Sequence, residues 1–404
     1  MNINPNTKKI KTRMTSPKIT NMKASKLFLS FAIVLISIAS FAQQRSVSQT
    51  GNQSATGNCS LGTVSPGSAT ICAGSSVTLQ ATPVASFNCF TDKVLTAGNL
   101  NYQYSSTAVD QSKNVYFSGA YNGDIGIGVQ PLAGIGNRSF FLVKYDSCGK
   151  LKWAIRGGSS INSQIGNDGG KGIATDANGN VYVVGRYNQT CTIYGANGTS
   201  YSSAYTNNSS SPGAQDGFLV KINATGEVVW GSTITGGSND GFNGVTVDAN
   251  GNPIVTTVYN GNPITGNATI YSNNTLTSLA PGNNSQTAAV IKFSAAGAVE
   301  WITKIFNNEA VASSLVTDVS SNIYVTGWYN SINDGAPAQV TDASNNTNTI
   351  ANAGIGAAYL LKLNSSGNWQ WGTGIGNAGA SGNTLCYGND VAVDAAGNPW
   401  VAGY

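Results

Sequence analysis

Few residues of this chain could carry out chemistry, because it contains no histidine and only 9% of its residues are charged. Catalysis by an imidazole acid or base is therefore excluded. Carboxylates remain: Asp168, Asp240 and Asp390 lie in "GNDGGKG", "SNDGFNG" and "GNDVAVD", each expected to precede a strand. They could serve a hydrolase or lyase as acid and base, or they could stabilise turns. We favour the second interpretation.

Metal and cofactor sites have little support in the sequence. The segment "DANGN" at Asp176 and Asp248 offers oxygen ligands, but no glutamate completes the D-x-[DN]-x-[DN]-G-x5-E calcium loop. An aspartate that accepts backbone N–H groups within a turn explains the segment without metal. No cysteines show CxxC spacing, which argues against zinc. We expect no cofactor, with calcium at these turns as the alternative.

One phrase with a lysine, a glycine five residues later and a tryptophan four residues after that occurs four times. An example is "FLVKINATGEVVW", from Phe218 to Trp230. The lysines are Lys144, Lys221, Lys292 and Lys362, and the tryptophans are Trp153, Trp230, Trp301 and Trp371. We expect each tryptophan to fill the seam between neighbouring units and to be mostly buried. Each lysine stem is expected to be buried, with its ammonium near a carboxylate or backbone carbonyl; a functional lysine ring is the alternative.

A second phrase, such as "TDANGNVYVVGRY" from Thr175, alternates with the first. Its aspartate is followed four residues later by an asparagine in five copies, at Asp110, Asp176, Asp248, Asp318 and Asp394. The mean period is 284/4 = 71 residues, which indicates a repeat architecture.

Each phrase has the pattern of a β-hairpin, in which Asn178-Gly179 would supply the positive φ angles of a two-residue turn. Two hairpins make a four-stranded antiparallel unit, and such units bury both faces when they pack in a ring. The sequence therefore predicts an all-β β-propeller with about four full blades and part of a fifth. We expect the blades at about 105–160, 171–235, 243–305 and 313–375, with a partial blade at 389–404, and the chain to be a fragment.

The alternation of D-x-x-G-N-x-Y-V-x-G with K-x-x-x-x-G-x-x-x-W resembles the SBBP (seven-bladed β-propeller) repeat of secreted bacterial proteins. The resemblance covers roughly residues 93–404 and implies a propeller exported from the cell. The segment "GTVSPGSATICAGSSVTLQAT" (Gly62–Thr82) is similar to the opening of an Ig-like repeat from surface proteins of Bacteroidetes-type bacteria. Residues 43–88 are accordingly assigned to a linker and a partial Ig-like segment, and residues 89–404 to the propeller.

The connections between the two hairpins of a unit are long, so their length falls on one rim of the propeller. They are Asn188–Gly217, Asn260–Thr287 and Asn330–Ala357. Loops on a rigid scaffold are common binding sites, although solvated decoration is the alternative. We expect these insertions to lie outside the repeated strands, so that the fold survives their removal. The candidate ligand-binding side chains are aromatic: Tyr194, Tyr201, Tyr205 and Tyr271.

Residues 1–42 have the pattern of a signal peptide: seven cations, no acid and the apolar run Leu27–Ala39, with Met22 as an alternative start. An uncleaved anchor is the alternative, although the run is shorter than a spanning helix requires. Seven of the 21 Lys and Arg residues lie in this segment, which leaves 14 against 17 acids, or about −3. We therefore expect no nucleic-acid partner and no membrane span after cleavage. Export would permit disulfides among Cys59, Cys72, Cys89, Cys148, Cys191 and Cys386.

Three functions compete at this stage. The first is a secreted or surface-displayed scaffold, not an enzyme, that binds glycan or protein through the long-loop rim. The second is a carboxylate-dependent hydrolase or lyase with its site at the propeller channel. The third is a purely structural stalk module at the cell surface.

Overall fold

The computed structural model describes residues 63–65, 80–82, 99–127, 130–135, 139–158, 171–187, 190–202, 215–237, 239–260, 267–280, 286–307, 309–330, 337–351, 353–354, 356–376 and 385–404. The signal peptide, most of the linker and partial Ig-like segment, Asp168 and Tyr205 lie outside these residues. Within the segment at residues 43–88, β1 (Thr63–Ser65) pairs antiparallel with β2 (Gln80–Thr82). None of the described residues forms a helix that could cross a membrane.

The propeller repeats form antiparallel sheets of consecutive strands, here called units 1 to 5, with strands A to D in chain order. Unit 1 consists of β3 (Asn99–Val109), β4 (Val115–Asn122), β7 (Ser139–Tyr145) and β8 (Leu151–Gly158). Unit 2 consists of β9 (Gly172–Thr175), β10 (Val181–Tyr187), β13 (Asp216–Ile222) and β14 (Val228–Thr235). Unit 3 consists of β15 (Gly241–Val247), β16 (Pro253–Tyr259), β19 (Thr287–Phe293) and β20 (Val299–Phe306).

Unit 4 consists of β21 (Glu309–Thr317), β22 (Ile323–Asn330), β25 (Gly356–Leu363) and β26 (Trp369–Ile375). Unit 5 consists of β27 (Gly388–Val393) and β28 (Pro399–Gly403). The all-β, propeller-type fold with antiparallel units is as the repeat predicted.

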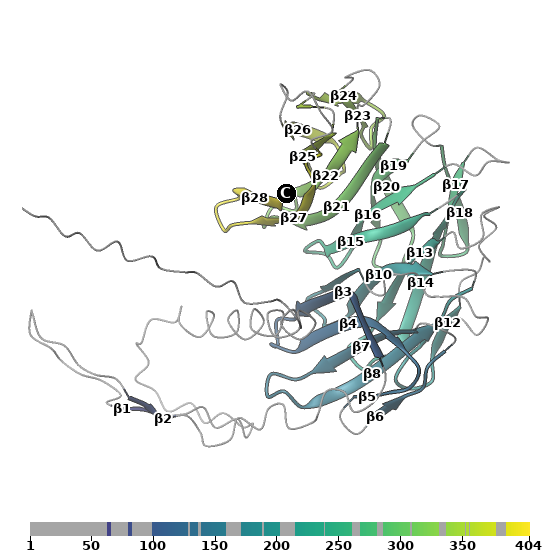
Figure 1. Cartoon of the computed structure of the whole chain (residues 1–404), viewed down its shortest axis with the longest axis vertical. Helices are drawn as coiled ribbons and strands as arrows, with labels where there is room; N and C mark the ends of the chain where they lie inside the picture. Colours follow the sequence, from purple (N-terminus) through teal and green to yellow (C-terminus); the bar gives the residue numbers. More distant parts are fainter. Residues whose placement is uncertain are drawn as a thin grey trace, which may run out of the picture. The chain divides into compact units, whose positions relative to one another are not determined.

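The A strands of successive units contact one another in chain order: β3 contacts β9, β9 contacts β15, β15 contacts β21 and β21 contacts β27. Figure 1 shows β3, β15, β21 and β27. Apolar side chains fill the space between neighbouring sheets: Phe140 and Ile155 of unit 1, for example, belong to one buried cluster with Val181 and Phe218 of unit 2. Similar clusters join unit 2 to unit 3 and unit 3 to unit 4. The core therefore lies between the units, because a single four-stranded sheet cannot bury both of its apolar faces by itself.

The A–B turns differ from the predicted two-residue type. In unit 2 the Asp176 N–H donates to Asn180 O and the Gly179 N–H donates to Asp176 O, at 3.0 and 3.1 Å. Gly179 has a φ of 74°, whereas Asn178 is not among the residues with positive φ. The loop is therefore a β-turn from Asp176 to Gly179 that ends in one left-handed residue, longer than a two-residue loop, so only the fourth residue of the motif requires that conformation.

The long insertions lie outside the four repeated strands but pair with the repeated sheets, a contact that the sequence analysis did not predict. Each holds a hairpin whose first strand pairs with strand D of the preceding unit, extending three of the four-stranded sheets to six strands. The added hairpins are β11 (Thr192–Tyr194) with β12 (Ser200–Ser202), β17 (Ala268–Ser272) with β18 (Thr275–Leu279), and β23 (Ala338–Thr341) with β24 (Thr347–Ile350). Their apolar side chains Ile193, Ile270 and Val340 are fully buried. The insertions therefore close the exposed edges of the D strands.

In unit 1 the corresponding connection forms β5 (Ile125–Ile127) and β6 (Gln130–Leu132), which pair with each other as a separate two-stranded sheet. Its apolar residues Ile125, Ile127 and Leu132 pack into a buried cluster with Phe141 and Val143 of the same unit. This insertion therefore folds onto its own unit.

Candidate functional site

The aspartate and asparagine of the repeated turn bind each other. Asp176 Oδ1 accepts the backbone N–H of Asn180 at 2.9 Å, and Asp176 Oδ2 accepts the side-chain amide of Asn180 at 2.7 Å. The same pair of hydrogen bonds occurs at the turns of Asp110, Asp248, Asp318 and Asp394. The four-residue spacing thus reflects a turn in which N–H groups occupy the carboxylate oxygens.

The lysine and the tryptophan of the other phrase share one acceptor on the next unit. The carbonyl of Ala224 accepts Lys144 Nζ at 3.2 Å and Trp153 Nε1 at 3.1 Å. Lys144 Nζ also lies 5.2 Å from the centroid of the Tyr116 ring. The next seam repeats the shared carbonyl with Lys221, Trp230 and Ala295. These lysines are buried and bind between units, so they are not presented to a ligand.

The glycine of the phrase receives the tryptophan of the preceding unit. A Cβ on Gly226 would lie 3.1 Å from the Trp153 indole, and a Cβ on Gly297 would lie 2.9 Å from the Trp230 indole. Both glycines also have a left-handed φ, 90° and 89°. Gly367 stands in the same relation to Trp301. The residue is therefore glycine for two reasons, its backbone conformation and the indole that covers it.

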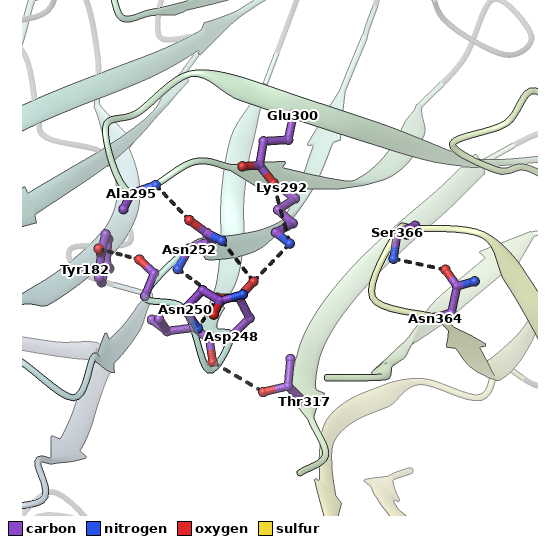
Figure 2. Close-up of polar contacts among 12 residues, drawn as sticks. Tyr182, Asp248, Asn250, Asn252, Lys292, Ala295, Glu300, Thr317, Asn364 and Ser366 are labelled. Carbon is purple, nitrogen blue, oxygen red and sulfur yellow. Dashed lines mark hydrogen bonds and ion pairs between the residues drawn. The ribbon is translucent and has the colours of Figure 1, made fainter. Parts of the chain in front are cut away.

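Unit 3 departs from this pattern, as Figure 2 shows. Where the other full units have a tyrosine at the start of strand B, unit 3 has Ile254. Lys292 Nζ then binds Asp248 Oδ2 directly at 2.9 Å, with Glu300 at 3.5 Å. In unit 2, by contrast, the Tyr182 hydroxyl contacts Asp176 Oδ2 at 3.5 Å and donates to Gly251 O at 2.8 Å. The tyrosine therefore separates lysine from aspartate, and its replacement allows an ion pair.

Burial of the tryptophans declines along the chain. Trp153 is 6% exposed, Trp230 and Trp301 are partly buried, and Trp371 is 38% exposed. All four occupy the same register, each opposite the lysine nine residues earlier. The expectation of a mostly buried side chain is therefore wrong for Trp371, and no glycine among the described residues lies against its indole as Gly226 lies against Trp153. Lys362 Nζ lies 4.9 Å from the Tyr324 ring centroid.

The candidate ligand-binding tyrosines fall into different environments. Tyr194 is 39% exposed, and its ring lies 5.4 Å from the guanidinium carbon of Arg156. Tyr271 is partly buried and donates to Asn274 Oδ1 at 2.9 Å. Tyr201 is not an exposed anchor, which corrects the prediction: its hydroxyl is buried, burial raises its pKa, and its ring packs against Gly231. Strand β12 places the Tyr201 side chain between the β11–β12 hairpin and strand β14 of unit 2.

The inserted hairpins present a neutral surface. Residues 190–202, 267–280 and 337–351 contain one charged side chain in total, Asp342, and it is buried in a turn. The exposed positions are mainly hydroxyl-bearing, as at Thr275, Ser278 and Thr347, together with Leu276 at 57% exposure. This rim can offer hydrogen bonds and small apolar faces without a strong field.

Two of the three candidate acids lie in the described residues, and both bind protein groups. Asp240 precedes β15, as predicted, and its Oδ1 accepts the backbone N–H of Asn260 at 2.7 Å. Asp390 lies within β27 rather than before it, and its Oδ1 accepts the Ser314 hydroxyl of unit 4 at 2.7 Å. Both contacts favour the structural interpretation of these carboxylates.

Asp216, at the start of β13, is the acid that the sequence analysis missed. It is 1% exposed, and neither carboxylate oxygen accepts a hydrogen bond of ordinary geometry. Burial, followed by the nearby charge of Asp240, raises its pKa to about 8, while the Gly236 N–H lowers it slightly. One signal was available: the equivalent residues Ser139, Thr287 and Ala357 are all uncharged. A buried carboxylate at one copy of a repeat is a departure of the kind that marks functional sites.

The cysteines of the described residues show no catalytic arrangement. Cys148 forms a disulfide. Cys191 is a buried thiol whose pKa burial raises to about 12, and Cys386 is a partly buried thiol. A thiol with a raised pKa is a poor nucleophile.

One curated relative of this chain is itself named as a repeat-containing protein. No family model matches the chain, so its resemblance to the SBBP repeat stays a prediction. An uncharacterized WD repeat-containing protein of Acanthamoeba polyphaga mimivirus is 27% identical over 244 residues, which cover 54% of this chain and 17% of that protein. The chain thus spans under a fifth of that relative's length.

Among solved structures, virginiamycin B lyase from Staphylococcus aureus aligns with 68% of this chain and 96% of its own, at 8% identity and a TM-score of 0.23. A streptogramin B lyase aligns with 76% of this chain and 93% of its own, at the same identity and TM-score. The antiparallel units and their inter-unit cores make this chain a repeat protein of the β-propeller type.

Proposed function

We propose that this protein is a secreted or surface-displayed β-propeller scaffold that binds a neutral glycan or a protein surface through the rim of inserted hairpins. The observation that carries the proposal is the near absence of charge from three hairpins that are nevertheless firmly docked on the sheets. A rigid surface loses little entropy on binding. Hydroxyl and amide groups on such a surface suit sugars or peptide groups rather than phosphates.

The exposed residues of this rim set the expected strength of binding. Tyr194 and Leu276 supply apolar contact area, and the threonines and serines of β18 and β24 supply donors and acceptors. Apolar and aromatic anchors usually carry most of the affinity at such surfaces. With few anchors, we expect weak binding by one molecule, strengthened when many copies are displayed together. The basic and apolar pattern of residues 1–42 supports the proposed location at or outside the cell surface.

The test is to screen the secreted chain on arrays of glycans and of extracellular proteins. Tyr194→Ser and Leu276→Ser should each weaken binding without unfolding the protein. Val319→Ser is the matched control, because Val319 is 93% exposed on an A–B turn, which belongs to the opposite rim. Binding should also change little between low and high salt. Equal losses for all three variants, or affinity that falls steeply with salt, would contradict the proposal.

A carboxylate-dependent hydrolase or lyase is the second candidate, and the Asp216–Asp240 pair is the observation that favours it. A carboxyl group with a pKa near neutrality can act as a general acid. Against it, both side chains are at most 1% exposed, so a substrate would not reach them. A screen of glycoside and ester substrates with the wild-type chain and Asp216→Asn would decide. Activity that this substitution abolishes in a folded protein would favour the enzyme.

A further inference from the structure

The position occupied by Asp216 is equivalent in all four full units. In each unit, the first or second residue of strand C pairs with the tyrosine at the end of strand B. The pairs are Tyr121 with Ser139, Tyr187 with Asp216, Tyr259 with Thr287 and Tyr329 with Ala357. Only unit 2 places a carboxylate there. The repeat fold does not require an acid at this position, so the acid of unit 2 calls for its own explanation.

Tyr187 departs from its counterparts in the same unit. The hydroxyls of Tyr121, Tyr259 and Tyr329 each donate to a backbone carbonyl of the B–C connection, at 3.1, 3.1 and 3.0 Å. The Tyr187 hydroxyl is buried without a hydrogen bond of ordinary geometry; the Thr233 hydroxyl approaches it, and the Asp216 carboxylate lies close enough for its charge to raise the pKa of Tyr187. Thr233, opposite Phe218 on the same face of the sheet, has a buried hydroxyl that faces the hydroxyls of Tyr187 and Tyr201. Three neighbouring side chains therefore direct oxygens into one buried region.

The neighbouring backbone adds further oxygens. A Cβ on Gly236 would meet the carbonyl oxygen of Asn260 and would lie 2.7 and 2.8 Å from the two carboxylate oxygens of Asp240. The Gly236 N–H faces Asp216 and interacts with its carboxylate. Gly236 thus contacts both carboxylates, and a side chain at this position would collide with Asn260 O and Asp240.

A buried carboxylate without a counter-charge costs several kcal/mol, so its charge is usually compensated by a proton, a cationic side chain or a metal. The charge acting on Asp216 is Asp240, which has the same sign. The possible ligand atoms here are carboxylate, carbonyl and hydroxyl oxygens, while the backbone N–H groups of Gly236 and Asn260 each face one of the two carboxylates. Oxygen ligands of this kind select hard cations, and calcium tolerates irregular sets of six to eight of them.

We propose that Asp216 and Asp240 bind a calcium-class divalent cation between units 2 and 3, with neutral oxygens and water completing its coordination. The described residues contain no cluster of three or more acidic, histidine or cysteine ligands, so the charge of the site comes from two carboxylates. Sites with few charges bind calcium weakly, with dissociation constants of about 10⁻⁴–10⁻³ M, as in extracellular modules. The cation would join the two units at the rim of inserted hairpins.

The experiment compares thermal unfolding of the full chain after dialysis against EDTA, with and without millimolar CaCl2. Calcium that binds only the folded state should raise the unfolding midpoint progressively with concentration, whereas NaCl of equal ionic strength should not. Tb³⁺ should emit when tyrosine is excited, because Tyr187 lies beside the site, and CaCl2 should quench that emission by displacement. Asp216→Asn and Asp240→Asn should each abolish both responses.

Asp146→Asn is the matched control, because Asp146 supports a C–D turn through hydrogen bonds to Cys148 and Lys150 that an asparagine oxygen can also accept. This variant should keep the full response to calcium. If Asp216→Asn does not fold, the terbium and calcium titrations of the wild-type chain still decide. The proposal would be overturned if the wild-type unfolding midpoint were the same in EDTA and CaCl2 and no tyrosine-sensitised terbium emission appeared. In that case the carboxylates of Asp216 and Asp240 would share a proton instead of a cation.

Discussion

The contact between each tryptophan and the next glycine predicts that Gly297→Ala destabilises the protein more than its backbone conformation explains. Gly297 has a φ of 89°, and the Trp230 indole lies 2.9 Å from where a Cβ would stand. Gly198, in the turn of the β11–β12 hairpin, has a φ of 88° and no atom within 4 Å of that position. The two glycines therefore differ in their neighbours and hardly at all in φ.

The expected magnitudes follow from these two environments. A left-handed non-glycine residue costs about 1–2 kcal/mol, so Gly198→Ala should lower the free energy of unfolding by about that amount. Gly297→Ala adds overpacking against the indole, which costs about 1–3 kcal/mol more. The alanine cannot be accommodated by a small tilt of the ring alone, because Trp230 Nε1 is also fixed by its hydrogen bond to Ala295 O at 3.0 Å.

The assay is denaturant unfolding followed by tryptophan fluorescence, with hydrogen exchange of units 2 and 3, since repeat proteins can unfold in parts. The double mutant with Trp230→Ala completes a cycle: in that background Gly297→Ala should lose only what Gly198→Ala loses. Equal losses for the two glycine variants, or an unchanged loss without the indole, would refute the seam contact as the source of the effect.

Three further predictions follow from the described contacts. Trp153→Ala should lower the free energy of unfolding by about 3–5 kcal/mol. Trp371→Ala should lower it by much less, because Trp371 is 38% exposed. Denaturant unfolding of both variants under the same conditions would measure the two losses, and equal losses would contradict the prediction. Deleting residues 267–280 should destabilise unit 2 and promote aggregation, because it uncovers the edge of β14 and removes the buried Ile270 from the core. Light scattering and thermal unfolding would detect this, and an unchanged midpoint would restore the prediction that the insertions are dispensable. Burial alone would raise the pKa of Asp248, but hydrogen bonds from Asn252 and Lys292 hold this pKa below the ordinary 3.8. The resulting stabilisation is present above pH 3.8 and is lost as the pH falls through the lowered pKa. A plot of the free energy of unfolding against pH should therefore fall less steeply at acid pH for Asp248→Asn than for the wild-type chain.

The fold was predictable because the repeat reports the same local physics several times. The aspartate–asparagine spacing fixes a turn, and the alternation of hairpins predicts antiparallel units. The lysine, glycine and tryptophan of the second phrase could be placed in register from sequence alone. Their partners could not, because Ala224 and Ala295 contribute a backbone carbonyl, for which residue type carries no signal.

The candidate site was less predictable, for a physical reason. The insertions have the composition of solvated loops, yet a strand added at a sheet edge needs few apolar residues: Ile193 anchors β11, and the backbone supplies the rest of the pairing. Tyr201 illustrates the limit. Its sequence neighbours are polar, and its burial results from the docking of one hairpin between two sheets. Tertiary contacts of this kind leave no periodic pattern.

Departures from the repeat are more informative about function than the repeat itself. Ile254 in place of tyrosine changes how Lys292 is satisfied, because Lys292 forms an ion pair with Asp248 at 2.9 Å. Asp216 in place of an uncharged residue leaves two buried oxygens without partners and so creates a requirement that the other units lack. The first substitution is compensated within the described residues, whereas the second is not. A difference that the fold does not compensate by itself points to something outside the chain, and this is why the inference of a bound cation is placed at Asp216 and not at the more numerous aspartates of the turns.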